Sequence, residues 1–279
     1  MNKLYINLIK NVLTDYYRAD LGEYRPLQIY SSKWKLPLNM IRILLYVNRI
    51  FNNGKITICE KLTYSNKNRL EGRDWPTYAD TMIGLKRLNN IEYCINDIIA
   101  KKIPGDFIET GVWRGGATIF MKALLKSEGI TNRNVWVADS FEGLPCPNED
   151  KFPDDKKSTL HNLYQLAIPV ETVKNNFKKY GLLDSKVKFL KGWFKNTLPT
   201  ALIGRLALIR LDGDMYESTM DGLVNLYPKL SKGGYIIIDD WGCVEACKHA
   251  VIDFRKKFGI KDKIIKIDWT GVFWKKSGK

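Results

Sequence analysis

The stretch that decides the fold is PGDFIETGVWRGGA, residues 104–117. Pro104 and Gly105 end the helical pattern before it, and the short apolar segment Asp106–Glu109 has the length of a buried strand. A glycine-rich turn, ETGVWRGG (109–116), then leads directly into an apolar helix. A strand, a glycine turn and a helix in this order predict the first βα unit of an open α/β sheet.

Outward from this unit, strand and helix patterns alternate along the chain. The expected strands are residues 106–109, 135–138, 187–190, 206–211 and 235–238, and the expected helices lie near residues 81–100, 117–127, 169–180, 216–230 and 244–258. Residues 264–269 and 272–274 predict a final hairpin around Gly271. We therefore expect a doubly wound, mostly parallel sheet with helices on both faces, an antiparallel last strand and an N-terminal helical extension.

Composition limits the class of protein. The chain has 279 residues, 45% of them hydrophobic, and five cysteines without the spacing of a disulfide framework, which indicates a globular protein of a reducing compartment. The net charge of +15 favours acidic partners. Thirteen Lys/Arg and six Asp/Glu lie in residues 1–75, which we expect to form a basic extension with lid, substrate or oligomer contacts. Residues 76–279 would form the α/β domain.

No secretory signal or membrane span is expected, because the first ten residues lack a long apolar core. The most membrane-like stretch, Leu36–Phe51, is shorter than a span and contains Arg42 and Arg49 on one helical face. We predict a cytoplasmic location. The amphipathic stretch leaves two alternatives open: peripheral contact with the inner membrane surface, or packing on the main domain.

The turn after the first strand indicates the kind of ligand. Gly111 and Gly115 have the spacing G-x-x-x-G instead of the G-x-G-x-x-G of dinucleotide sites, which disfavours a nicotinamide oxidoreductase. Glu109 suits a ligand with a cationic, amino-acid-like end, such as S-adenosylmethionine. Asp139, at the end of the second strand, can accept both hydroxyls of a ribose. A tight βα connection without a ligand is the alternative interpretation of the glycines.

Carboxylates follow two further strands, in DGD (212–214) after residues 206–211 and in DD (239–240) after residues 235–238. Parallel strand ends lie close together, so these groups repel one another unless protons or a cation compensate. Oxygen ligands favour Mg²⁺ or Mn²⁺, which can hold two substrate oxygens and polarise a hydroxyl while a spare carboxylate takes its proton. For either pair alone, turn formation or helix capping is the alternative.

These motifs resemble those of the macrocin-type (TylF-like) O-methyltransferases. The shared stretches are GRDWP (72–76), TMIGLKRLNN (81–90), PGDFIETGVWRGGA (104–117), VWVADSFEGLP (135–145), GWFKNTLP (192–199), LIRLDGDMYEST (208–219), YPKLSKGGYIIIDDWG (227–242) and IDWTGVFWKK (267–276), with LYINLIKNVLTDYYR (4–18) similar as well. Residues about 20–65 match least. The resemblance implies a class I methyltransferase sheet, S-adenosylmethionine and Mg²⁺ as cofactors, and a homodimer.

The resemblance also implies roles for individual residues. Asp212, Asp239 and Asp240 would bind Mg²⁺, and Asp214 would be the general base. The cofactor residues would be Thr81 and Met82 closing over it, Glu109, Thr110 and Gly111 on its methionine side, Asp139 and Ser140 at the ribose, Gly192, Trp193 and Phe194 at the adenine, and Asp212 beside them. His161, in the loop after Pro145, stays open as an alternative base.

We therefore expect a Mg²⁺-dependent O-methyltransferase that acts on a sugar hydroxyl of an antibiotic, a surface glycan or a lipid-linked glycoside. One alternative is a catechol or other phenol as the acceptor. Another is a non-catalytic protein that binds nucleic acid or membrane through residues 1–75, with nucleic acid the less favoured partner. His249, Cys243 and Cys247 lack the spacing of a zinc site and are expected to be structural.

Overall fold

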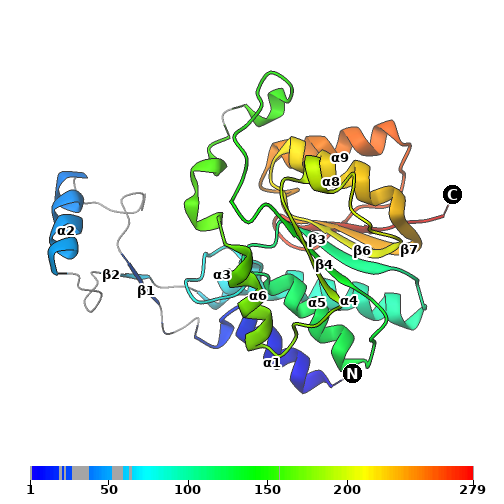
Figure 1. Ribbon diagram of the computed structural model, residues 1–279, viewed down its shortest axis with the longest axis horizontal. Helices are drawn as coiled ribbons and strands as arrows, with labels where there is room; N and C mark the ends of the chain where they lie inside the picture. Colours follow the sequence, from blue (N-terminus) through cyan, green and yellow to red (C-terminus); the bar gives the residue numbers. More distant parts are fainter. Residues whose placement is uncertain are drawn as a thin grey trace.

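The computed structural model describes residues 2–18, 21, 23–26, 38–51, 59–62, 65–156 and 158–278. Within those ranges, seven strands form one sheet in the order β5-β4-β3-β6-β7-β9-β8 (Figure 1). They are β3 (Asp106–Thr110), β4 (Val135–Asp139), β5 (Val187–Lys191), β6 (Leu206–Leu211), β7 (Leu230–Ile238), β8 (Ile265–Lys266) and β9 (Val272–Lys275). Pairs from β5 to β7 are parallel, whereas β9 is antiparallel to both β7 and β8. The predicted mixed sheet is confirmed.

Helices cover both faces of the sheet (Figure 1). One face carries α1 (Lys3–Leu13), α4 (Leu85–Ala100), α5 (Gly116–Ser127) and α6 (Val170–Lys179), and the other carries α8 (Tyr216–Leu226) and α9 (Glu245–Lys257). Successive strand residues point to opposite faces, so Phe107 packs in the first core and Ile108 in the second. Because both faces are buried, the strands are apolar throughout, which is the pattern that the sequence shows.

The strand order places a crevice at the centre of the sheet. The chain runs from β3 outward to β4 and β5, and then returns to β6 on the opposite side of β3. Gly111, directly after β3, has a φ of +80°, and a Cβ there would lie 1.7 Å from the carbonyl oxygen of Asp212. Only glycine allows these two strand ends to approach so closely. Ligands of open α/β sheets bind at such a reversal.

Some expected elements have different ends in the structure. The helix predicted over residues 81–100 begins at Leu85, because residues 81–84 run past the start of α5, where the Gly116 N–H donates to the Asp80 carbonyl oxygen at 3.0 Å. The helix predicted over residues 216–230 ends as α8 at Leu226, and a 3₁₀ turn with Pro228 follows it. Further short elements are η1 (Tyr16–Arg18), η2 (Pro153–Asp155), η3 (Leu160–Asn162), η4 (Tyr164–Leu166), η5 (Tyr227–Lys229) and α7 (Phe194–Thr197).

The N-terminal extension combines two kinds of structure. α1 contributes Ile6, Ile9 and Leu13 to the main core, and α3 (Asn66–Glu71) precedes α4. Between them, β1 (Glu23–Pro26) and β2 (Cys59–Leu62) form an antiparallel pair that the sequence did not indicate, and α2 (Leu38–Phe51) lies beyond them, away from the sheet (Figure 1). Parts of the poorly matching segment 20–65 lie outside the described residues. The domain boundary near residue 75 stays a prediction.

α2 contains most of the amphipathic stretch Leu36–Phe51. Four of its apolar side chains are exposed, namely Met40, Ile43, Tyr46 and Ile50, and so is Arg42. Residues 36–37 and the side chain of Arg49 lie outside what the structure describes. Among the described helices, none combines the length and apolar character needed to cross a bilayer.

Candidate active site

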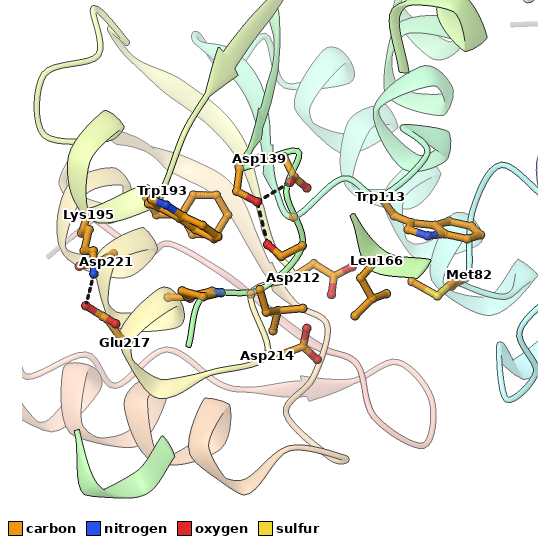
Figure 2. Close-up of a pocket in the computed structure, with 18 residues that line it drawn as sticks. Met82, Trp113, Asp139, Leu166, Trp193, Lys195, Asp212, Asp214, Glu217 and Asp221 are labelled. Carbon is orange, nitrogen blue, oxygen red and sulfur yellow. Dashed lines mark hydrogen bonds and ion pairs between the residues drawn. The ribbon is translucent and has the colours of Figure 1, made fainter. Parts of the chain in front are cut away.

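A pocket opens at the carboxyl ends of β3, β4 and β6 (Figure 2). The lining residues are Met82, Gly111, Trp113, Asp139, Ser140, Gly143, Leu144, Pro145, Leu166, Trp193, Phe194, Lys195, Asp212, Gly213, Asp214, Glu217, Ser218 and Asp221. The cavity thus brings together eight of the predicted site residues: Met82, Gly111, Asp139, Ser140, Trp193, Phe194, Asp212 and Asp214.

The pocket is elongated. Figure 2 shows Trp193, Lys195, Glu217 and Asp221 at one end, Met82, Trp113 and Leu166 at the other, and Asp139, Asp212 and Asp214 between them. A ligand that filled the cavity would therefore pass the end of β4 and then the end of β6. This shape suits an extended molecule with an aromatic group at one end.

Asp139 joins three loops at the pocket. Its carboxylate accepts the N–H groups of Val112 and Phe141, each at 2.7 Å, and its carbonyl oxygen accepts the N–H of Gly192 at 2.9 Å. Burial raises the pKa of Asp139, although these N–H donors oppose the shift. Each carboxylate oxygen can accept a further hydrogen bond, so a ligand hydroxyl can be added without displacing the backbone.

Glu109 lies near the end of β3 and is 1% exposed. One of its oxygens pairs with Arg210, while the other, Oε2, is buried without a hydrogen-bond partner among the described residues. Burial raises the pKa of Glu109 to about 8, and the charge of Arg210 opposes that rise. A buried acceptor without a donor is costly, and a cationic group of a ligand would satisfy it.

Six predicted site residues are absent from the lining, and three of them, Thr81, Thr110 and Gly192, act through the backbone or through packing. The carbonyl oxygen of Thr110 accepts the N–H of Asp212 at 2.9 Å. Thr81 packs closely on the start of α5. A Cβ added to Gly116 would lie 2.6 Å from the Cβ of Thr81. Gly192, with a φ of +136°, turns the chain into Trp193. All three hold lining residues in place.

Three carboxylates converge at the ends of β6 and β7. One oxygen from each of Asp212, Asp214 and Asp240 lies within 4.8 Å of the others. Asp214 has a φ of +56°, a left-handed conformation that costs energy for a non-glycine residue, and its N–H donates to Asp240 at 3.2 Å. Backbone strain of this kind persists where the surrounding structure enforces it, often at functional sites.

Burial and mutual repulsion raise the pKa of all three groups. The pKa of Asp212 rises to about 6, through burial and then the charge of Asp239, and that of Asp214 to about 7, through burial and then Asp212. Burial, followed by Asp214, also raises the pKa of Asp240. Arg210 pairs with Asp212 at 2.9 Å, but among the described residues no lysine or arginine pairs with Asp214 or Asp240. A hard divalent cation fits this donor set.

Asp239 is adjacent to Asp240 in sequence, but its surroundings differ. Its two oxygens pair with Arg87 and with Arg210. Its carbonyl oxygen accepts the Thr270 hydroxyl at 3.0 Å. Asp239 therefore lies beside the three converging carboxylates, held by two guanidinium groups.

Several lining residues were not among those predicted from the sequence. Lys195 pairs with Glu217 at 3.4 Å, and burial together with Glu217 raises the pKa of Asp221 to about 6. Glu217 and Asp221 are four residues apart on α8, a spacing that indicates one helix face and was the available signal. The Nε1–H of Trp113, a residue of the glycine turn itself, donates to the Gln165 carbonyl oxygen at 3.0 Å. His161 is not among the lining residues.

The sheet and the pocket at its reversal point define the class of protein. A seven-stranded sheet of this order, with its last strands antiparallel and its pocket at the glycine turn, is a class I methyltransferase fold. The calicheamicin methyltransferase CalS11 shows the same fold, with a TM-score of 0.56 at 16% identity over 98% of this chain and 91% of that one.

Closer similarities identify the family. The model of the macrocin-O-methyltransferase (TylF) family matches residues 2–276, and the chain belongs to that family. It is 57% identical over 208 residues to the 8-demethyl-8-(2,3-dimethoxy-alpha-L-rhamnosyl)-tetracenomycin-C 4'-O-methyltransferase of Streptomyces olivaceus, covering 74% of this chain and 79% of that one. It is 50% identical over 212 residues to the mycinamicin III 3''-O-methyltransferase of Micromonospora griseorubida, covering 75% and 83%. The O-methyltransferase NovP has a TM-score of 0.83 at 44% identity over 99% of both chains.

Proposed function

We propose that this O-methyltransferase transfers the methyl group of S-adenosylmethionine to a sugar hydroxyl and requires Mg²⁺. The observation that carries the proposal is the convergence of Asp212, Asp214 and Asp240 beside an elongated pocket at the reversal of the sheet. The names of two relatives specify glycosides: a dimethoxy-rhamnosyl tetracenomycin and mycinamicin III. These relatives support a sugar as the acceptor.

The nucleoside part of the donor would occupy the end of the pocket that Trp193 and Phe194 line, with Gly192 giving the backbone its turn. The aromatic rings offer an apolar surface to the adenine. Asp139 would accept the ribose hydroxyls through the lone pairs that its two backbone donors leave free. The hydroxyl of Ser140 donates to the Gly143 carbonyl oxygen at 2.7 Å, which supports a role for this residue in shaping the ribose site.

The methionine part would lie toward Glu109 and Gly111. The buried Oε2 of Glu109 would accept the ammonium group, which gives this atom the donor it lacks. Gly111 permits close approach of the backbone, and Thr110 holds the end of β6 beside it. Met82, which lines the same end of the pocket, would close over the donor together with the adjacent Thr81.

Asp212, Asp239 and Asp240 would hold Mg²⁺. The convergence of Asp212 and Asp240 supports this set, and Asp239 keeps lone pairs on both oxygens in addition to its two arginine contacts. When bound, the ion supplies charge that polarises an acceptor hydroxyl. Asp214 would take the proton of that hydroxyl, because it lines the pocket beside Asp212 and its carboxylate has no lysine or arginine partner among the described residues.

Asp214 and Asp239 both lie next to Asp212 and Asp240, so either could bind the ion. Substitution of each residue separates the two roles. If Asp214 is the base, Asp214→Asn retains Mn²⁺ binding and loses turnover, whereas Asp239→Asn loses both. Electron paramagnetic resonance of Mn²⁺ measures binding, and mass spectrometry measures methylation. The reverse result would make Asp214 the ligand and leave the base to be sought elsewhere, with His161 as the next variant.

The proposed acceptor is tested by offering the enzyme a panel of glycosides beside catechols, with S-adenosylmethionine and either Mg²⁺ or EDTA. We expect a methylated glycoside whose formation stops in EDTA and returns with added Mg²⁺. Methylation of catechols alone would mean that the acceptor is a phenol and not a sugar. Turnover that persists in EDTA would remove Mg²⁺ from the proposal.

We also propose that the protein is a cytoplasmic homodimer. The exposed apolar residues Met40, Ile43, Tyr46 and Ile50 of α2 support contact with a second surface, either another copy or an anionic membrane. Sedimentation velocity tests the dimer, and co-sedimentation with vesicles of anionic phospholipid tests the membrane. Loss of vesicle binding in Arg42→Glu would support peripheral contact, and unchanged binding would remove it.

A further inference from the structure

We propose that Arg87 is a positioning residue that orients the Asp239 carboxylate for the divalent ion. The inference rests on the proposed Mg²⁺ site. Arg87 belongs to α4 and is 5% exposed. Its guanidinium pairs with Asp239, its Nε lies 3.0 Å from Asp268, and its Nη2 donates to the Gly72 carbonyl oxygen at 3.2 Å. One side chain thus joins the N-terminal extension, the end of β7 and the β8–β9 turn.

Two glycines lie directly against the Arg87 side chain. A Cβ on Gly72 would lie 2.6 Å from the Arg87 Nη2, and a Cβ on Gly271 would lie 3.2 Å from its Cδ. Gly72 also has a φ of +63°, where glycine carries no steric penalty. The side chain therefore lies close to the backbone at both glycines, and its contacts with Asp239, Asp268 and the Gly72 carbonyl oxygen hold the guanidinium.

The partner on the far side of Arg87 is itself fixed. Asp268 is 6% exposed, and its Oδ1 accepts the N–H groups of Thr270 at 3.0 Å and Gly271 at 2.8 Å. The Thr270 hydroxyl in turn donates to the Asp239 carbonyl oxygen at 3.0 Å. Asp268, Arg87 and Asp239 therefore form a closed frame with the turn between β8 and β9.

The second arginine on Asp239 cannot replace this frame. Arg210 divides its contacts among Glu109, Asp212 and Asp239, so its position depends on the carboxylates of both the donor and the metal sites. Arg87 contacts neither Glu109 nor Asp212 by any ion pair among the described residues. A carboxylate that a fixed guanidinium holds by one oxygen presents its remaining lone pairs in a defined direction. A buried ion pair seldom adds net stability, so stability alone does not account for Arg87.

The test is the conservative variant Arg87→Lys in the full chain, with Mn²⁺ as the probe. Lysine keeps the positive charge but lacks the planar guanidinium with its several donors. A change in Mn²⁺ affinity therefore reports the orientation of the Asp239 carboxylate and not the loss of a charge. We expect the dissociation constant for Mn²⁺, measured by electron paramagnetic resonance, to rise about tenfold or more, as for other partners that orient metal ligands. The matched control is Lys86→Arg, since Lys86 is 41% exposed and pairs with Glu71 at 2.9 Å. It should bind Mn²⁺ as the wild type does.

Binding of S-adenosylhomocysteine and the thermal midpoint in chelator show whether each variant is folded. A folded Arg87→Lys that binds Mn²⁺ with wild-type affinity overturns the inference and leaves the proposed metal site intact. A wild type that binds no Mn²⁺ overturns both. If Arg87→Lys does not fold, Asp268→Asn takes its place, because the asparagine oxygen can still accept from Thr270 and Gly271 while its amide faces the arginine. An unchanged affinity there also overturns the inference.

Discussion

The crevice has carboxylates at two pairs of strand ends, and the protein holds the two groups in opposite ways: the first end is that of β3 and β4, and the second is that of β6 and β7. At the ends of β3 and β4, the Asp139 carboxylate accepts two backbone N–H groups, and Glu109 has an arginine on one oxygen. At the ends of β6 and β7, one oxygen from each of Asp212, Asp214 and Asp240 gathers within 4.8 Å, and only Asp212 has an arginine.

This difference indicates that the two ends have different roles in binding. At the first end, backbone N–H groups and Arg210 hold the carboxylates, and only Oε2 of Glu109 lacks a donor among the described residues. We expect this end to recognise its ligand by hydrogen bonds and shape. The second end carries negative charge that the described side chains do not balance, so it depends on protons or on a cation. Arg210 contacts Glu109, Asp212 and Asp239, and thus joins the two ends. Single substitutions at each end can separate their contributions.

The largest effect is expected for Asp212→Asn. Removal of a proposed metal ligand should lower turnover by about a thousandfold, because the charge at the acceptor hydroxyl is lost. S-adenosylhomocysteine should still bind, since the first end is intact. Turnover is measured with the glycoside found in the acceptor panel. Glu171→Gln on α6, an exposed pair with Lys174, is the control and should be fully active. Full activity of Asp212→Asn would refute the metal assignment.

The close contact between the two ends is tested by Gly111→Ala. A Cβ there meets the Asp212 carbonyl oxygen at 1.7 Å at a φ of +80°, so we expect a loss of roughly 3 kcal/mol in the free energy of unfolding. Gly129→Ala is the matched control. Gly129 has a φ of +67° and open space around it, so the loss should be about 1 kcal/mol. Urea denaturation measures both, and equal losses would mean that backbone strain alone matters.

The first end is probed by Asp139→Asn. Asparagine retains one acceptor oxygen of the two, so one backbone N–H loses its partner and the ribose loses a charged acceptor. We expect the affinity for S-adenosylhomocysteine to fall about tenfold, equivalent to ~1.4 kcal/mol. Mn²⁺ binding should be unchanged. A parallel loss of Mn²⁺ affinity would show that the ends are not separable.

The smallest effect is a pH dependence of the metal-free protein. The raised pKa values of Asp212, about 6, and Asp214, about 7, mean that the folded state binds protons more tightly than the unfolded chain. Stability should therefore fall as pH rises from about 4 to about 7, in the window between the unfolded and folded pKa values. Saturating Mg²⁺ should flatten the profile. Thermal midpoints in EDTA and in Mg²⁺ measure this, and a midpoint that rises with pH in EDTA would contradict it.

The sequence predicted the sheet well because strands buried on both faces are apolar throughout and glycines mark the turns. The DGD and DD motifs likewise placed carboxylates at neighbouring strand ends. Local patterns carried no signal for contacts between distant segments. The arginine pairs of Asp239 join residues that are 152 and 29 positions apart, and β1 pairs with β2 across residues that carry no strand pattern of their own. The ligand roles of the site residues stay predictions, because a sequence pattern can place these side chains together without showing what binds to them.

The most direct measurement is a calorimetric titration of S-adenosylhomocysteine and of Mg²⁺ into the wild type and Asp240→Asn, with NAD as the control ligand. We expect saturable binding of S-adenosylhomocysteine to both proteins, a separate Mg²⁺ signal in the wild type alone, and no binding of NAD. Absence of S-adenosylhomocysteine binding, or equal Mg²⁺ binding by wild type and Asp240→Asn, would contradict it.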